Sequence, residues 1–176
     1  MTMLKEITRR AIEADSLEYI GLIEETTELV RSEEGRIGNL NIEGRLARVK
    51  ASGEATVVGD LHGDLESLVH ILKTSGFVEK AAHKKEILTV FLGDYGDRGS
   101  YSPEVYYIVL KLKQIFPRNV VLMRGNHEGP DDLQAHPHDL PQNLLERFGK
   151  EGRGVYARIR DQYQHLYTTM IVEQSY

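Results

Sequence analysis

Three short apolar runs, separated by helical patterns, constrain the fold of this chain most strongly. The runs cover residues 55–58, 86–92 and 119–123, are rich in β-branched residues, and each end at or just before a glycine. Between them, apolar residues recur at helical spacing over 65–72 and 105–116. The order strand, helix, strand, helix, strand predicts a parallel sheet with right-handed crossovers.

The carboxyl ends of these three strands should share one edge of the sheet, where open α/β sheets bind ligands. The run 86–92 is apolar enough to predict a strand that is buried on both faces. Asp64 is placed to cap the first helix, Gly76 to end it, and Pro117 to end the second helix.

The segments outside this unit give weaker patterns. The pattern over residues 1–34 predicts helix, with Ser16 as the cap of a second helical run. The pattern over residues 35–53 predicts a short strand or hairpin. Residues 129–141 predict a loop. Two helices, a strand and a turn are then expected over 142–149, 153–167, 168–172 and 173–175.

A polar cluster flanked by glycine follows each of the three apolar runs. The clusters are Gly59-Asp60-Leu61-His62-Gly63, Gly93-Asp94-Tyr95-Gly96-Asp97-Arg98-Gly99 and Gly125-Asn126-His127-Glu128. Each cluster alone also fits turn chemistry, a helix cap or a histidine that binds a backbone carbonyl. Three clusters at one sheet edge favour a functional site.

The residue types in these clusters fit one chemistry. In extended backbone the side chains of Asp60 and His62 face the same way, and with Asp94 they form a mixed oxygen and nitrogen site that suits Mn, Fe or Zn. A second oxygen of Asp94 could bridge to a second metal held partly by Asn126.

Three further residues of the clusters fit phosphoryl transfer. Arg98 offers two donors for phosphate oxygens. His127 could protonate a leaving oxygen, with Asp97 holding its ring.

Composition narrows the class of protein. The chain has no cysteine, which excludes disulfide scaffolds, zinc–thiolate sites and cysteine nucleophiles. A net charge of −5 argues against a general nucleic-acid or membrane-surface binder. Apolar runs are too short to span a bilayer and residues 1–14 lack the apolar core of a signal peptide, so we expect a cytoplasmic protein.

Taken in order, the motifs GDLHG, GDYGDRG and GNHE resemble those of the PPP-type metallophosphatases, the serine/threonine protein phosphatase family. The flanking Ser75-Gly76-Phe77, Phe116-Pro117 and Leu122-Met123-Arg124 are similar to the family pattern, and residues 129–141 resemble its archaeal branch. The resemblance covers residues 54–176. We therefore expect residues 1–53 to be N-terminal helices and a lead-in strand packed on an incomplete domain over 54–176.

The resemblance implies a mixed α/β (α+β) fold, a metallophosphoesterase-like β-sandwich flanked by helices, of which this chain holds the N-terminal half to two-thirds. It implies two divalent metals, with manganese favoured and iron or zinc also suitable. Asp60 and His62 would bind the first metal, Asp94 would bridge both, and Asn126 would bind the second metal and the phosphate.

The same resemblance implies that Arg98 holds the phosphate and that His127, paired with Asp97, is the general acid. The expected reaction is hydrolysis of phosphoserine or phosphothreonine in a phosphoprotein by a metal-activated water. Dinucleoside-polyphosphate hydrolases and other phosphoesterases share these motifs and stay as an alternative. A catalytically inactive chain, or one that binds phosphate without turnover, is the other alternative.

The chain departs from the family pattern in two places. Gly96 stands where the family usually has valine, which should loosen the loop. Family members also continue past a segment like 167–176 into a strand with a His-Gly-Gly motif, and downstream histidines and an arginine complete the site.

We therefore expect either a truncated gene product or a fragment of a longer chain, natural or expressed as such, with a weak second metal site and an exposed apolar sheet that could self-associate. His136, His138 and His165 are conceivable substitute ligands, although each is expected to be a surface histidine.

Overall fold

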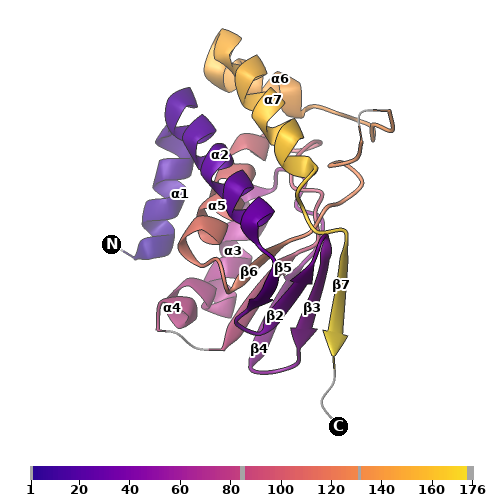
Figure 1. The fold of residues 1–176 in the computed structure, drawn as a ribbon. Coiled ribbons are helices and arrows are strands. Elements are labelled where there is room, and N and C mark those ends of the chain that lie inside the picture. Colours follow the sequence, from indigo (N-terminus) through magenta and orange to yellow (C-terminus); the bar gives the residue numbers. More distant parts are fainter. Residues whose placement is uncertain (1, 84–85, 131, 174–176) are drawn as a thin grey trace.

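The computed structural model describes residues 2–83, 86–130 and 132–173, and it contains two sheets with helices gathered on one side of them (Figure 1). One sheet contains β4 (Glu54–Val58), β5 (Ile87–Phe91) and β6 (Val120–Leu122) in that order. Both pairs of neighbours are parallel, so the predicted strand–helix–strand–helix–strand unit is confirmed. The three carboxyl ends therefore lie at one edge of the sheet.

The central strand β5 is buried on both faces, as predicted. Leu88 and Val90 belong to the apolar cluster shared with the other sheet, whereas Ile87 and Phe91 belong to the cluster shared with the helices. The alternation follows from the two-residue period of a strand. The molecule is thus a β-sandwich with helices packed on one sheet.

The other sheet is formed by segments far apart in the sequence. A meander of β1 (Gly35–Ile37), β2 (Leu40–Glu43) and β3 (Leu46–Lys50) replaces the strand or hairpin predicted for 35–53. Gly38 and Gly44 have φ of 62° and 59° in its two turns, a conformation that favours glycine.

The fourth strand of this sheet, β7 (Thr169–Glu173), comes from the far end of the chain. It pairs in parallel with β3, and the two strands lie side by side in Figure 1. The predicted strand is therefore confirmed, but the turn expected to begin at Glu173 is wrong, because Glu173 is still in β7. Gln174 and Ser175 lie outside the described residues.

The N-terminal helical region is two helices, α1 (Met3–Glu13) and α2 (Ser16–Ser32). Asp15 caps α2 because its side chain accepts a hydrogen bond from the backbone N–H of Glu18. The predicted cap at Ser16 is therefore wrong by one residue. Ser16 is buried in the first turn, and its hydroxyl binds the carboxylate of Glu151.

The first crossover helix, α3 (Leu65–Ser75), has the predicted ends. Asp64 accepts a hydrogen bond from the N–H of Ser67 at 2.9 Å, and Gly76 follows the helix with a φ of 62°. A short helix that the sequence did not predict, α4 (Phe77–Ala82), begins directly after Gly76 and buries Phe77 and Val78. The second crossover helix is α5 (Ser102–Ile115).

The last helices are α6 (Leu140–Phe148) and α7 (Gly152–Tyr163), joined by the 3-10 turn η1 (Gly149–Glu151). Both begin earlier than predicted, and α7 ends four residues before the expected 167. The start of α6 depends on a distant residue, since the carboxylate of Asp97 accepts hydrogen bonds from the N–H groups of Asp139 and Leu140.

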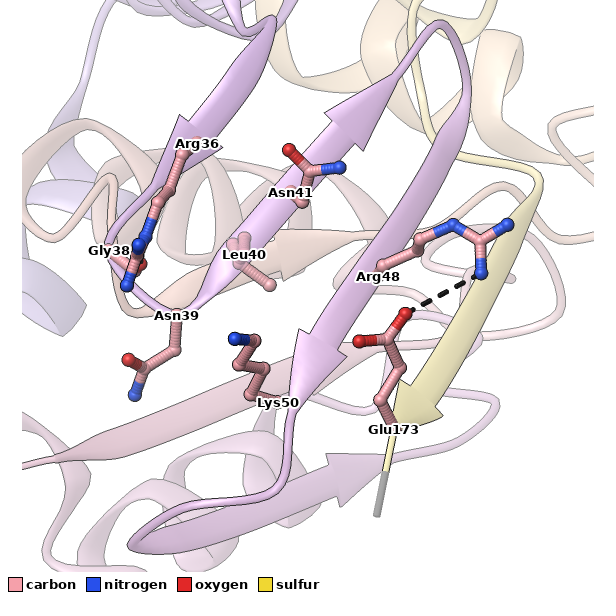
Figure 2. Close-up of a pocket in the computed structure, with 8 residues that line it drawn as sticks. All are labelled: Arg36, Gly38, Asn39, Leu40, Asn41, Arg48, Lys50 and Glu173. Atoms are coloured by element: carbon pink, nitrogen blue, oxygen red, sulfur yellow. Dashed lines mark hydrogen bonds and ion pairs between the residues drawn. The ribbon is translucent and has the colours of Figure 1, made fainter. Parts of the chain in front are cut away.

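Two surface features involve the sheets. An apolar groove of about 1010 Å³ lies beside β4, and its lining includes the exposed side chains of Val57, Leu92 and Val172. A smaller pocket, drawn in Figure 2, contains Arg48, whose Nη1 lies 3.6 Å from Oε1 of Glu173. Among the described residues, none of the helices combines the length and the apolar composition of a membrane-spanning segment.

Candidate metal centre and active site

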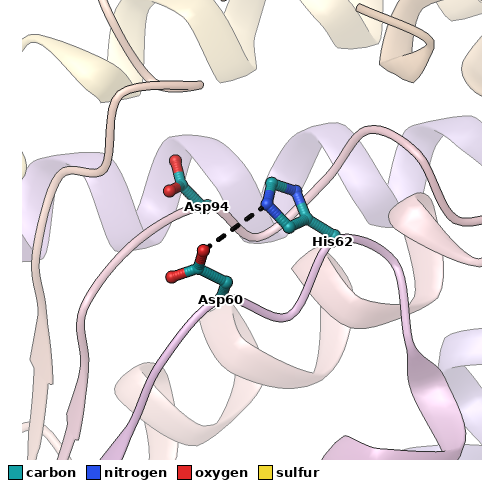
Figure 3. Close-up of side chains that lie close together, drawn as sticks. All are labelled: Asp60, His62 and Asp94. Carbon is teal, nitrogen blue, oxygen red and sulfur yellow. Dashed lines mark ion pairs between the residues drawn. The ribbon is translucent and has the colours of Figure 1, made fainter. Parts of the chain in front are cut away.

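The loops after β4 and β5 bring together the three side chains predicted as metal ligands. Ligand atoms of Asp60, His62 and Asp94 all lie within 4.8 Å of one another, and Figure 3 shows them converging. The Nε2 atom of His62 is 3.8 Å from Oδ2 of Asp60. The predicted convergence is therefore present in the folded chain.

The backbone explains this convergence differently from the sequence argument. His62 has a φ of 43° and Asp94 a φ of 53°, so the extended geometry assumed between Asp60 and His62 is wrong. Left-handed backbone at residues other than glycine costs about 1–3 kcal/mol and is common at functional sites. The strained turn is held because the N–H groups of Leu61 and His62 donate to the carbonyl of Asp94 at 3.0 and 2.8 Å.

Hydrogen bonds orient the candidate ligands. Nδ1 of His62 lies 3.0 Å from the carbonyl oxygen of Gly96, which makes it the donor and leaves the Nε2 lone pair for a cation. Oδ1 of Asp94 accepts the N–H of His127 at 2.8 Å. Two carboxylates and one imidazole nitrogen are suitable donors for a divalent transition metal.

Arg98 lies between two histidine rings at this site. Its Nη1 is 3.0 Å from Nε2 of His62, and its Nη2 is 3.2 Å from Nε2 of His127. The guanidinium can only donate hydrogen bonds, so both ring nitrogens act as acceptors in this arrangement. The exposed Arg98 thus places positive charge beside the candidate cation ligands.

A histidine–carboxylate pair lies beneath Arg98. Nδ1 of His127 is 2.7 Å from Oδ2 of Asp97, and both side chains are 2% exposed. Burial raises the pKa of Asp97, but hydrogen bonds from His138, His127 and the N–H of Leu140 outweigh it and lower this pKa from 3.8 to about 2. Asp97 is therefore ionised and fixes the Nδ1–H tautomer of His127.

The other predicted ligands are Asn126 and the three substitute histidines. Asn126 is exposed, next to His127, and its carbonyl accepts the N–H of Gly129 at 3.1 Å. The three substitute histidines do not join the cluster of Asp60, His62 and Asp94. His136 is exposed and His165 half-buried. The prediction of a surface histidine is wrong for His138, which binds Asp97 and Tyr156.

One residue of the third cluster has a role that the sequence did not reveal. Glu128 is fully buried, and its carboxylate accepts hydrogen bonds from the N–H groups of Asp94, Tyr95 and Gly125 and from the Tyr106 hydroxyl. Burial raises the pKa of Glu128, and the backbone hydrogen bonds oppose this. The sequence signal that could have indicated this role is the position of Glu128 directly after His127, in a polar cluster where no ligand role was predicted for it.

Two glycines of the clusters are required by close contacts. A Cβ on Gly125 would lie 2.3 Å from Oδ1 of Asp94, so the third loop can approach the second only without a side chain. A Cβ on Gly96 would lie 2.9 Å from Cε2 of the buried Tyr106. Gly96 therefore makes room for Tyr106, and the loop is closely packed at the position where loosening was expected.

A mixed carboxylate–imidazole cluster at the carboxyl ends of parallel strands has the donor types of the divalent metal sites that catalyse phosphoryl transfer. Comparison with known families agrees, because the family of calcineurin-like phosphoesterases matches residues 55–174. The chain belongs to this family, which implies divalent metal ions as cofactors.

Similar curated proteins carry serine/threonine phosphatase names. A probable serine/threonine-protein phosphatase of Encephalitozoon cuniculi is 32% identical over 171 residues, which is 97% of this chain and 33% of that protein. The serine/threonine-protein phosphatase 4 catalytic subunit of Candida glabrata is 42% identical over 86 residues, 49% of this chain and 25% of that protein. The chain thus spans a quarter to a third of the length of these relatives.

A solved structure supports the fold. A protein serine/threonine phosphatase from Saccharomyces cerevisiae, described as similar to human phosphatase PP5, superposes with a TM-score of 0.63 at 19% sequence identity. The match covers 90% of this chain and 45% of that chain. The predicted mixed α/β sandwich flanked by helices is therefore confirmed.

Proposed function

We propose that this chain supplies catalytic groups for metal-dependent hydrolysis of phosphoserine or phosphothreonine in proteins. The observation that carries the proposal is the convergence of Asp60, His62 and Asp94 beside Arg98 and the His127–Asp97 pair. The names of the similar proteins favour a phosphoprotein as the substrate. No feature of the described residues favours a dinucleoside polyphosphate over it.

Asp60, His62 and Asp94 would hold the first divalent metal ion, and Asp94 and Asn126 would hold the second. When bound, such ions acidify a water molecule for attack on phosphorus and screen the charge of the phosphate. Manganese is the proposed metal, and iron or zinc would accept the same donor set.

The other residues act on the phosphate and on the leaving group. Arg98 would turn its guanidinium from the histidine nitrogens to two phosphate oxygens, which it can bind as a fork. His127, when protonated on both nitrogens, would donate its Nε2 proton to the serine or threonine oxygen that leaves. Asp97 stabilises that charged ring through Nδ1.

Turnover of a phosphoserine peptide with Mn²⁺ tests the proposal, with diadenosine tetraphosphate as the competing substrate. Asp94→Asn removes a charged metal ligand and His127→Asn removes the general acid, so each should reduce peptide hydrolysis by about a hundredfold or more. Glu66→Gln and His70→Asn, at exposed positions on α3, serve as matched controls. Unchanged rates in both site variants, or preference for the dinucleotide, would contradict the proposal.

Metal stoichiometry tests the alternative of an inactive chain. Two tightly bound Mn²⁺ ions per chain by elemental analysis, both lost in Asp94→Asn, would support the two-metal proposal. One weakly bound ion without turnover would favour a chain that binds phosphate only. A cytoplasmic location and self-association through the exposed sheet stay predictions.

A further inference from the structure

Asp97 has more hydrogen-bond partners than a dyad with His127 requires. Its Oδ2 is 2.7 Å from Nδ1 of His127 and 2.9 Å from Nδ1 of His138. Its Oδ1 accepts the N–H groups of Asp139 and Leu140 at 2.8 and 2.7 Å, at the N-terminus of α6. The two oxygens thus face different partners, and His138 shares the oxygen that His127 uses.

His138 is itself fixed from the other side. Its side chain is 9% exposed, and its Nε2 lies 2.7 Å from the hydroxyl of Tyr156 on α7. Because Asp97 is ionised, Nδ1 of His138 carries the hydrogen, and in the neutral ring Nε2 accepts a hydrogen bond from the hydroxyl of Tyr156. The series Tyr156, His138, Asp97, His127 is therefore a chain of side-chain hydrogen bonds with defined donors.

We propose that His138 and Tyr156 are positioning residues for His127, acting through the carboxylate of Asp97. This inference rests on the proposed function for its kinetic consequence, but the hydrogen-bond chain exists independently of turnover. His138 holds Oδ2 of Asp97 where it accepts Nδ1–H of His127, so that Nε2 of His127 faces Arg98 at 3.2 Å. Loss of His138 would leave Oδ2 with His127 as its remaining partner, so the hydrogen bond to His127 would be less well fixed in direction although Oδ1 stays bound.

A purely structural role predicts something different. Oδ1 of Asp97 binds the first N–H groups of α6 without His138, so the start of that helix does not require the histidine. If His138 only packs the loop before α6, its replacement changes stability and leaves the His127 ring unaffected. If it positions Asp97, the hydrogen bond at Nδ1 of His127 weakens even in a fully folded chain.

The experiment compares His138→Ala, His138→Asn and Tyr156→Phe with the exposed controls His70→Ala and Tyr101→Phe. Asparagine keeps an amide donor near the position of Nδ1 and should rescue the alanine variant. Imidazole ¹⁵N and ¹H NMR reports the His127 Nδ1–H, and carboxyl ¹³C NMR reports the titration of Asp97. Steady-state kinetics on a phosphopeptide gives kcat and KM separately.

His138→Ala should speed solvent exchange of the His127 Nδ1–H, raise the pKa of Asp97 and lower kcat about tenfold without changing KM. Tyr156→Phe should give a smaller effect of the same kind, and His138→Asn should restore most of the signal. An unchanged His127 Nδ1–H signal in folded His138→Ala or Tyr156→Phe would overturn the inference. Altered NMR signals in a chain that hydrolyses no phosphopeptide would overturn the proposed function and leave the positioning role supported.

Discussion

The Oε2 atom of Glu128 accepts a hydrogen bond of 2.7 Å from the backbone N–H of Asp94. The same oxygen accepts a hydrogen bond from the N–H of Gly125 at 3.0 Å. Oε1 accepts hydrogen bonds from the N–H of Tyr95 at 3.1 Å and from the hydroxyl of Tyr106 at 2.9 Å. One buried carboxylate therefore ties the loop after β5 to the loop after β6. The position of the candidate ligand Asp94 depends on it.

Glu128→Gln should weaken both the fold and the cation site. The amide group of glutamine would place donors against backbone N–H groups, and an unsatisfied buried group costs about 1–3 kcal/mol. We expect urea denaturation to show a loss of this size and Mn²⁺ titration to show lower affinity. The exposed Glu66→Gln should change neither, and equal Mn²⁺ affinity in the Glu128 variant would refute the role given to this residue.

Asp97 should make the stability of the folded chain depend on pH in the acid range. Folding lowers the pKa of Asp97 from 3.8 to about 2. The contribution of this shift to the free energy of unfolding is therefore complete above pH 4 and is lost as the pH falls through 2. The shift corresponds to about 2 kcal/mol. The difference in unfolding free energy between the metal-free wild type and Asp97→Asn should shrink by this amount between pH 5 and 2, and a constant difference would contradict it.

Gly96→Val, the residue usual in the resembled family, should destabilise this chain. Its Cβ would lie 2.9 Å from the ring of Tyr106, which is 2% exposed and cannot move away freely. Overpacking of this kind costs about 1–3 kcal/mol. Thermal unfolding of Gly96→Val against the wild type measures the cost, and equal stability would contradict the close packing at this position. Gly154→Ala is the control, because a Cβ at this position would meet nothing within 4 Å.

A buried ion pair joins the end of α2 to the end of α5. Nζ of Lys113 donates to Oε1 of Glu33 at 2.6 Å and to the carbonyls of Pro117 and Val120, while the hydroxyl of Tyr167 binds the other oxygen of Glu33. Burial lowers the pKa of Lys113, and the carboxylate of Glu33 opposes this. The pair also fixes the segment that leads into β7.

Lys113→Met should cost about 3–5 kcal/mol because it leaves the charge of Glu33 buried without its partner. Lys113→Met with Glu33→Gln should be less destabilised than the sum of the two single variants, by about 0.5–3 kcal/mol. A double-mutant cycle in urea measures this coupling. Strict additivity would show that the two side chains do not stabilise one another.

The sequence by itself determined the parts of the fold that depend on neighbours along the chain. The period of apolar residues identified β4, β5, β6 and the crossover helices, and Asp64 and Gly76 marked the ends of α3. The three polar clusters could be placed at one sheet edge because parallel strands align their ends. These features rest on local geometry, which a pattern of residue types reports directly.

The tertiary structure decided whatever depends on contacts between distant segments. The pairing of β3 with β7, the early start of α6 on the carboxylate of Asp97, and the burial of His138 all join residues that the sequence separates. The left-handed turn at His62 likewise depends on hydrogen bonds to the loop of Asp94. A periodic pattern shows which face of an element is apolar but not which distant donor meets which acceptor, because packing of the whole chain sets those distances.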